Sequence, residues 1–326
     1  MCTERRAPTA STVWISYEPG PAGHDGRTGG VVHLNLSAPC LLRAVSSLAR
    51  PSPLSQTAPP VTNLITLTTD FGTGDAYVAA MKGTILSILP EARLVDITHD
   101  IAPQDVMAAA FVLREAVPYF PRGAVHLVVV DPGVGTDRRA VALAAHGSRF
   151  VGPDNGLFAL LLDGAAPDVV VSLDRPAYWR TPNPSQTFHG RDIFAPVAAH
   201  LAAGRTLSDV GTPIDALRPM HWALPIPDAQ GIRGWVVHID HFGNCITNIP
   251  ADLLHARRAG RPIKCFAGSA ILHGLHTTYG DVAPGEPLLL IGSSGLLEIA
   301  VHAGNAADLL SIRKGDPVNV VFLDDR

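Results

Sequence analysis

The sequence predicts an α/β domain with a largely parallel central sheet, followed by a C-terminal β-barrel domain. Strand-like runs alternate with helical patterns from residue 64 onward, which is typical of α/β layers. The segment AVHLVVVD (124–131) is almost continuously apolar, as expected of a central strand that is buried on both faces. Beyond residue 230 the helical patterns give way to short strands separated by turn residues.

The elements of the α/β domain follow one another in order. LITLTTD (64–70) is a β-rich run, and RLVDI (93–97) is a second strand. Between them, apolar residues recur at helical spacing before Pro90, namely Val78, Met81, Ile85 and Ile88. A second helix follows Pro103, with Val106, Ala110, Leu113 and Val117 on one face. Further strands are predicted near 140–145, 149–152 and 168–173, and a helix from about Ile193 to Ala203.

Two changes of composition divide the chain. Residues 1–62 hold scattered Gly, Pro, Ser and Thr with little periodicity, which predicts a disordered extension. The α/β domain then covers 63–225, and the β-barrel domain covers 230–326. The barrel strands are expected at 234–240, 262–268, 287–293, 296–302 and 317–323.

Composition and charge exclude several classes of function. The 326 residues carry a net charge of −4 and contain no basic block, so we expect no nucleic-acid partner. No apolar run reaches the roughly 20 residues that a membrane span needs. The four cysteines are far apart and match no zinc or CxxC spacing, which favours reduced thiols and a cytoplasmic protein.

Acidic residues follow three predicted strands of the α/β domain. Asp70 ends the first strand, His99 and Asp100 follow the second, and Asp131 follows the third. Ligands bind outside the carboxyl ends of the strands in open α/β sheets, so these residues are candidates for a functional site. The alternative is structural, since Asp commonly accepts hydrogen bonds from the backbone of a turn.

Two further polar motifs lie later in the chain. In TFHGRDIFAP, His189 precedes a predicted helix whose first turn contains Asp192, which could instead cap that helix. In IDHFGNCITNI (239–249), the residues Asp240, Asn244, Thr247 and Asn248 exceed what a plain hairpin needs. Both motifs suggest contact with a ligand, and a structural role remains open for each.

Two chemical interpretations compete for these residues. The carboxylates and imidazoles of Asp70, His99, Asp131, His189 and Asp192 are of the types that bind hard metal ions. None of them forms an HxxxH, HxH or DxH pair, however, so we predict no metal and no cofactor. In the metal-free interpretation a His and an Asp orient a water molecule, and an Arg stabilises the developing negative charge.

Six motifs in series carry a family resemblance, namely LTTDFG, DITHDI, HLVVVDPGVGT, VGPDNG, TFHGRDIFAP and IDHFGNCITNI. Together they resemble the S-adenosylmethionine hydroxide adenosyltransferase family, which is related to the fluorinases and chlorinases, over about residues 63–324. The resemblance implies hydrolysis of S-adenosylmethionine to adenosine and methionine. It also implies a homotrimer, with each ligand held between the N-terminal domain of one subunit and the C-terminal domain of the next.

The same resemblance implies roles for individual residues. Asp131, Arg138 and His189 would activate water, and Asp70 would hold the ribose hydroxyls. The remaining substrate contacts would come from the second domain. Asp240, Phe242 and Asn244 would meet the methionine and adenine portions, Tyr279 would stack on the adenine, and Ser293, Glu298 and Val301 would line the adenosine site.

Two alternatives to hydrolysis stay open. A halogenase would use the same fold to form 5′-halo-adenosine, but His189 stands where halogenases have Tyr, and Gln104 stands where the fluorinase has an aromatic residue. A protein that binds S-adenosylmethionine or adenosine without turnover is the second alternative. The complete set of Asp131, Arg138 and His189 weighs against it, because binding alone does not require that set.

Overall fold

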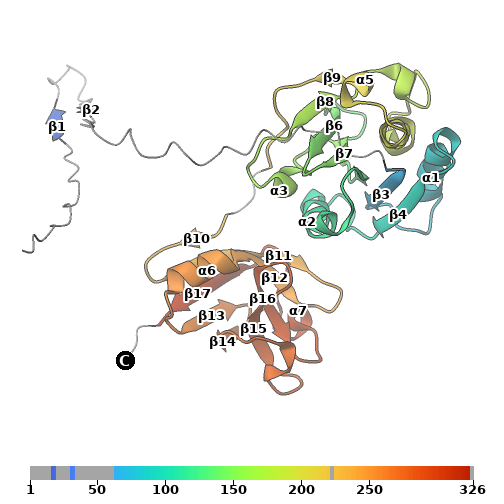
Figure 1. Cartoon of the computed structure of the whole chain (residues 1–326). Helices are drawn as coiled ribbons and strands as arrows, with labels where there is room; N and C mark the ends of the chain where they lie inside the picture. Colours follow the sequence, from blue (N-terminus) through green and yellow to red (C-terminus); the bar gives the residue numbers. More distant parts are fainter. Residues whose placement is uncertain (1–15, 20–29, 34–61, 221–223, 324–326) are drawn as a thin grey trace, which may run out of the picture. The chain divides into compact units, whose positions relative to one another are not determined.

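The computed structural model describes residues 16–19, 30–33, 62–220 and 224–323 (Figure 1). Contacts divide the chain into two units, residues 1–57 and 58–326, which are described separately. In the first unit β1 (Ser16–Pro19) pairs antiparallel with β2 (Gly30–His33). Apart from these two strands and residue 62, the predicted disordered extension over 1–62 lies outside the described residues.

A seven-stranded sheet forms the centre of the α/β domain. Its order is β4-β3-β5-β7-β6-β8-β9, and the first four of these strands are mutually parallel. The largely parallel sheet is therefore confirmed, with antiparallel strands at one side. The strands are β3 (Leu64–Thr69), β4 (Arg93–Thr98), β5 (Val125–Val129), β6 (Ala140–Ala145), β7 (Ser148–Pro153), β8 (Val169–Ser172) and β9 (Thr212–Pro213).

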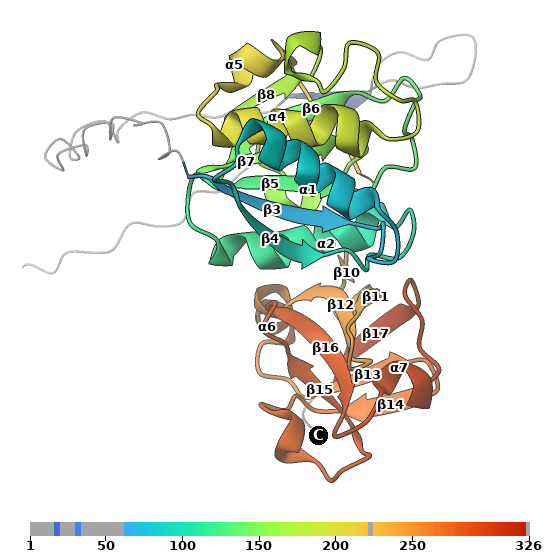
Figure 2. The same ribbon diagram turned by 90° about the vertical axis from the view of Figure 1, so that its right-hand side faces the viewer.

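Helices cover both faces of this sheet, which explains the continuous apolar run in β5. Figure 2 shows α1 (Tyr77–Ile88) and α4 (Ala195–Ala202) side by side over one face, where they pack on Leu127. On the other face α2 (Val106–Ala116) packs on Val128. Shorter helices are η1 (Val117–Tyr119), α3 (Ala159–Leu162), η2 (Pro176–Tyr178), the π-helix η3 (Gly190–Phe194) and α5 (Leu207–Val210).

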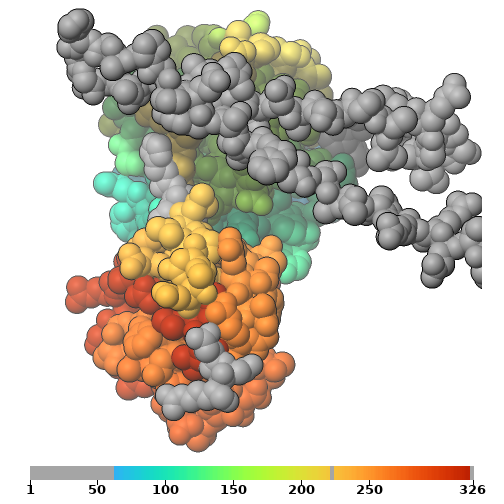
Figure 3. Space-filling model, turned by 90° about the vertical axis from the view of Figure 1, so that its left-hand side faces the viewer, coloured from blue at the N-terminus to red at the C-terminus, as the bar shows by residue number. Residues whose placement is uncertain are grey.

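The second domain is a nearly closed antiparallel barrel, as predicted. Its strand order is β14-β13-β17-β11-β12-β16-β15, with β10 added to β11. In the space-filling view, orange and red segments of different parts of the sequence meet on its surface (Figure 3), and β13 pairs with the last strand, β17. Its elements are β10 (Ile226–Pro227), β11 (Gly231–Ile239), β12 (Cys245–Pro250), α6 (Ala251–Arg258), β13 (Ile263–Ala267), β14 (Ala270–His273), η4 (Tyr279–Asp281), β15 (Pro287–Ile291), β16 (Leu296–Val301), α7 (Ala306–Leu309) and β17 (Pro317–Phe322).

The short helices of the barrel domain were not predicted. Helix α6 spans eight residues and buries only Leu254, so its sequence carries no apolar face. In the described part of the chain, no helix is both long and apolar enough to cross a membrane.

A buried histidine makes the stability of the α/β domain depend on pH. His126 in β5 is fully buried, its Nδ1 lies 2.8 Å from Thr66 Oγ1, and its ring stacks on Phe150. Burial lowers the pKa of His126 to about 4. The imidazole therefore stays neutral in the folded protein under conditions in which an unfolded chain is protonated.

We predict that His126 destabilises the folded protein as pH falls from about 6.5 to about 4. In this window the unfolded state binds a proton that the folded state excludes, so the free energy of unfolding decreases. The slope contributed by His126 approaches about 1.4 kcal/mol per pH unit. Urea unfolding across this range measures it against His126→Leu, and equal pH slopes for both proteins would contradict the prediction.

Candidate active site

A buried ion pair lies at the carboxyl end of β5. Asp131 follows that strand, and the turn Pro132–Gly135 brings Arg138 back onto it. The Arg138 Nε donates to Asp131 Oδ1 at 2.8 Å and to Oδ2 at 3.0 Å, and the Arg138 Nη2 also donates to Oδ2. Both side chains are nearly inaccessible to solvent, so each charge is neutralised by the other.

His189 completes this group from a distant part of the chain. The Arg138 Nη2 lies 2.8 Å from His189 Nδ1, whereas Asp131 makes no hydrogen bond to His189 in the described structure. Arg138 therefore stands between the other two residues. Burial lowers the pKa of His189, and the positive charge of Arg138 lowers it further against the opposing effects of Asp131 and Asp192.

A close backbone contact brings the two loops of this group together. Gly135 has φ +77°, and a Cβ at this position would lie 2.3 Å from the carbonyl oxygen of Gln186. Only glycine allows the turn after Asp131 to approach the segment before His189 so closely.

Asp192 fixes the loop that leads to His189. It is almost fully buried, and its carboxylate accepts hydrogen bonds from Arg191 at 2.7 and 2.8 Å and from the Ser185 backbone N–H at 2.9 Å. The hydrogen bond from Arg191 is the main cause that holds the pKa of Asp192 below its usual value. Asp192 thus holds the preceding loop rather than capping its helix, which begins as the π-helix η3.

Asp70 lies at the end of β3. The aromatic residues that adjoin Asp70 and His189 in the sequence contact each other. The Gln104 backbone N–H donates to Asp70 Oδ2 at 2.8 Å. The neighbouring Phe71 meets Phe188 edge-on with ring centroids 5.9 Å apart, and Tyr77 contacts both rings. These three aromatic residues were not among the predicted site residues, although Phe71 and Phe188 directly adjoin Asp70 and His189.

The barrel brings several of its predicted residues together. Asp240 Oδ1 accepts the backbone N–H groups of Phe242 at 2.9 Å and Asn244 at 2.8 Å, while Asp240 Oδ2 accepts from Asn244 Nδ2 at 2.9 Å. Tyr279 Oη donates to Glu298 Oε1 at 2.7 Å. Burial is the main cause that raises the pKa of Tyr279 to about 12 and of Glu298 above its usual value, and the charge of Asp240 adds to both shifts.

The other two predicted barrel residues are Ser293 and Val301. Ser293 is exposed in the turn between β15 and β16. Val301 is buried with 4% of its surface exposed, and it packs in the barrel core. No hydrogen bond in the described structure links either residue to Asp240 or Glu298.

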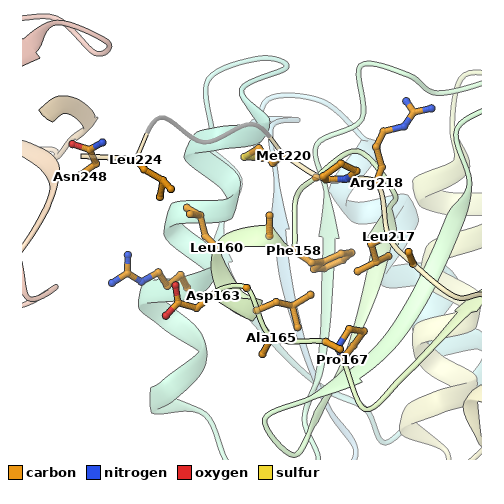
Figure 4. A pocket seen from close by; sticks show the side chains of 18 of the residues that line it. Phe158, Leu160, Asp163, Ala165, Pro167, Leu217, Arg218, Met220, Leu224 and Asn248 are labelled. Carbon is orange, nitrogen blue, oxygen red and sulfur yellow. The ribbon is translucent and has the colours of Figure 1, made fainter. Parts of the chain in front are cut away.

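A cavity in the described structure lies elsewhere. It has a volume of about 870 Å³ and is lined by Phe158, Leu160, Leu217, Met220 and Leu224, among others (Figure 4). Asn248 of the IDHFGNCITNI motif lines it, but none of the residues to which the resemblance assigns a catalytic or substrate-binding role does. Among the described residues, no three His, Cys, Asp or Glu side chains form a group that could hold a metal ion.

Comparison with family models matches both domains of the chain. Residues 65–211 match the N-terminal domain of the S-adenosylmethionine hydroxide adenosyltransferases, and residues 234–319 match their C-terminal domain. A structure from Thermotoga maritima aligns with a TM-score of 0.75 and 37% identity, over 79% of this chain and 99% of that chain. A structure from Thermus thermophilus aligns with a TM-score of 0.64 and 39% identity, over 79% and 99%.

Relatives of two kinds align over most of their length. A protein of Salinispora tropica named (R)-S-adenosyl-L-methionine hydrolase is 45% identical over 262 residues, which are 78% of this chain and 97% of that protein. A fluorinase of Actinoplanes sp. is 30% identical over 296 residues, which are 79% and 97%. The chain belongs to the S-adenosylmethionine hydroxide adenosyltransferase family.

Proposed function

We propose that this protein hydrolyses S-adenosyl-L-methionine to adenosine and L-methionine. The observation that carries the proposal is the buried Asp131–Arg138–His189 group, which is preformed at the carboxyl end of the parallel sheet. Relatives between 34% and 45% identical that bear the name (R)-S-adenosyl-L-methionine hydrolase support it. Fluorinases are more distant, at 28–30% identity.

The names of the relatives also suggest which epimer is the substrate. "L-methionine" already fixes the α-carbon, so the descriptor (R) refers to the sulfonium centre. The sulfonium sulfur is a stereocentre because it carries three different carbon groups and a lone pair. We propose the (R) epimer at sulfur as the substrate of this protein.

The reaction needs an aligned nucleophile more than an acid. The oxygen of water forms a bond to the ribose 5′-carbon while the electrons of the carbon–sulfur bond move to sulfur. Methionine leaves as a neutral thioether, and the water proton passes to solvent. No general acid and no cofactor is required, and holding water and substrate together can lower the barrier by several kcal/mol.

Arg138 determines how His189 can act on this water. A guanidinium group only donates hydrogen bonds, so His189 Nδ1 accepts from Arg138 Nη2 at 2.8 Å. A neutral His189 then carries its proton on Nε2, from which it donates to the oxygen of the nucleophile. His189 therefore orients the water and, together with Arg138, stabilises hydroxide-like charge, whereas Asp131 holds the guanidinium in place.

The substrate contacts are divided between two surfaces in this proposal. Asp70 would bind the ribose hydroxyls beside the aromatic rings, and the barrel residues would bind the adenine and methionine portions. Phe242 and Tyr77 are 72% and 50% exposed, and none of the residues proposed to bind the substrate lines the cavity of about 870 Å³. We propose a homotrimer in which a neighbouring barrel covers each α/β site.

The thiols of Cys245 and Cys265 are free and buried. Free thiols are typical of proteins in a reducing compartment, so we propose that this protein is located in the cytoplasm.

We expect the purified protein to convert the (R) epimer into equal amounts of adenosine and methionine, detected by chromatography. Added chloride or fluoride should give no 5′-halo-adenosine, and His189→Ala should slow turnover about 100-fold. Halo-adenosine as the main product would instead identify a halogenase. Tight calorimetric binding without methionine release would identify a binding protein.

Arg138→Ala is expected to lower kcat by about 100-fold or more, because it removes a donor from the developing charge. KM should change by less than about threefold if Arg138 does not bind the ground state. Arg139→Ala is the matched control, since its Nε donates to Asp154 at 2.8 Å without reaching His189. Equal loss of kcat in both variants would contradict the proposed role of Arg138.

Nitrogen NMR of ¹⁵N-labelled histidine tests the state of His189. We expect the Nε2–H tautomer and a pKa below 6.5, so that the imidazole stays neutral in mildly acidic solution. Arg138→Ala should raise this pKa by removing a neighbouring positive charge. A proton found on Nδ1 in the wild-type protein would show that the assigned direction of the hydrogen bond is wrong.

A further inference from the structure

The proposed function leaves His99 without a role, although it stands in one of the strand-end motifs. His99 follows β4 and is buried with 5% of its surface exposed. Its Nδ1 lies 2.9 Å from the hydroxyl of Thr69, the last residue of β3. His99 therefore contacts the strand end that carries Asp70.

A polar chain extends from His99 to the surface of the domain. The Nε2 of His99 lies 3.1 Å from Asp96 Oδ1, in a geometry too oblique for a regular hydrogen bond, and Lys82 Nζ donates to Asp96 Oδ2 at 2.6 Å. Burial raises the pKa of Asp96, but contacts with Lys82 and His99 outweigh this effect and keep the pKa below its usual value. Asp96 is therefore a carboxylate, which favours a proton on Nε2 of His99.

The carboxylate of Asp96 beside Nε2 favours one direction for the hydrogen bond at Thr69. With its proton on Nε2, His99 accepts at Nδ1, so the Thr69 hydroxyl donates its proton to the imidazole. The lone pairs of the same hydroxyl accept the Phe71 backbone N–H at 3.3 Å. Thr69 thus links the imidazole to the backbone immediately after Asp70.

The backbone of His99 holds the other side of the same turn. The Gly72 N–H donates to the His99 carbonyl oxygen at 2.8 Å. Asp70 therefore lies between Thr69 and Gly72, and both of these residues are hydrogen-bonded to His99. The Gln104 backbone N–H binds the Asp70 carboxylate itself, so His99 acts on the backbone and Gln104 acts on the side chain.

We propose that His99 is a positioning residue that, through Thr69, holds the turn 69–72 so that the Asp70 carboxylate faces the substrate. The inference rests on the proposed function only in taking Asp70 as a substrate contact. It assigns a role to a motif residue that touches neither the reacting atoms nor the water. This positioning role differs from metal binding, the other role considered for the imidazole of His99.

The chain offers a matched control for this proposal. Thr66 lies three residues earlier in the same strand, and its hydroxyl is 2.8 Å from Nδ1 of the buried His126. Thr66 and Thr69 are both fully buried and both contact an imidazole, but only Thr69 adjoins Asp70. Thr66→Val and Thr69→Val therefore both remove a buried hydroxyl group that contacts an imidazole, but only Thr69→Val does so next to Asp70.

We expect Thr69→Val to raise KM for S-adenosylmethionine about three- to tenfold, because the variant loses the hydrogen bonds to His99 and to the Phe71 backbone N–H. We expect kcat to change less than about twofold. Thr69→Ser should restore KM, and Thr66→Val should leave it unchanged even if both Val variants melt at lower temperature. Equal KM values for Thr66→Val and Thr69→Val would overturn the proposal.

A double-mutant cycle tests whether Thr69 acts through Asp70. In an Asp70→Ala background, Thr69→Val should no longer change KM, because no carboxylate remains to be positioned. A full additional increase in KM would assign Thr69 a role independent of Asp70 and overturn the proposal.

Calorimetry with adenosine separates this inference from the proposed function. If the wild-type protein hydrolyses nothing but binds adenosine, the proposed hydrolysis fails. The positioning role then still predicts weaker adenosine binding by Thr69→Val than by Thr66→Val. Unchanged adenosine affinity in both variants would overturn the positioning role even where hydrolysis is observed.

Discussion

The ion pair between Asp131 and Arg138 is the interaction on which the rest of the site depends. A guanidinium buried beside the end of β5 is strongly destabilising unless a carboxylate neutralises it, and Asp131 does so with both oxygens. Two of the guanidinium nitrogens are engaged with Asp131, and one of them, Nη2, also reaches His189. One ion pair therefore sets the path of the turn, the position of the positive charge and the tautomer of His189.

A second acid–arginine contact holds the other half of the site. Asp192 is bound by Arg191 and by the backbone of Ser185, which fixes the loop before the π-helix. Gly135 then lets the first turn lie against this loop at Gln186. Each of the two loops has hydrogen bonds of its own, so the contact between Arg138 and His189 does not depend on a single interaction. Preorganised donors of this kind need little rearrangement when charge develops on a nucleophile.

The sequence predicts the parts of this arrangement that depend on local pattern. The apolar run of β5 placed Asp131 at a strand end, and the spacing around Met81 and Ile85 predicted α1. Local sequence pattern does not show which side chains meet when 51 residues separate them. The grouping of Arg138 with Asp131 and His189 was therefore predicted from the family resemblance. The structure shows that Arg138 lies between the other two residues. The π-helix has no sequence signal of its own. The motif match also did not show that the side chain of Val301 packs in the barrel core.

The acidic groups of the two domains differ in how their charge is balanced. Asp131 and Asp192 each have an arginine of their own chain, whereas in the described structure no lysine or arginine pairs with Asp240 or Glu298. Burial and the charge of Asp240 raise the pKa of Glu298 above its usual value. S-Adenosylmethionine carries a sulfonium and an ammonium group. A ligand of this charge would relieve the repulsion between Asp240 and Glu298, and adenosine, which lacks both groups, would not. If the barrel residues bind the ligand as proposed, the unbalanced charge of Asp240 and Glu298 would therefore favour S-adenosylmethionine over adenosine.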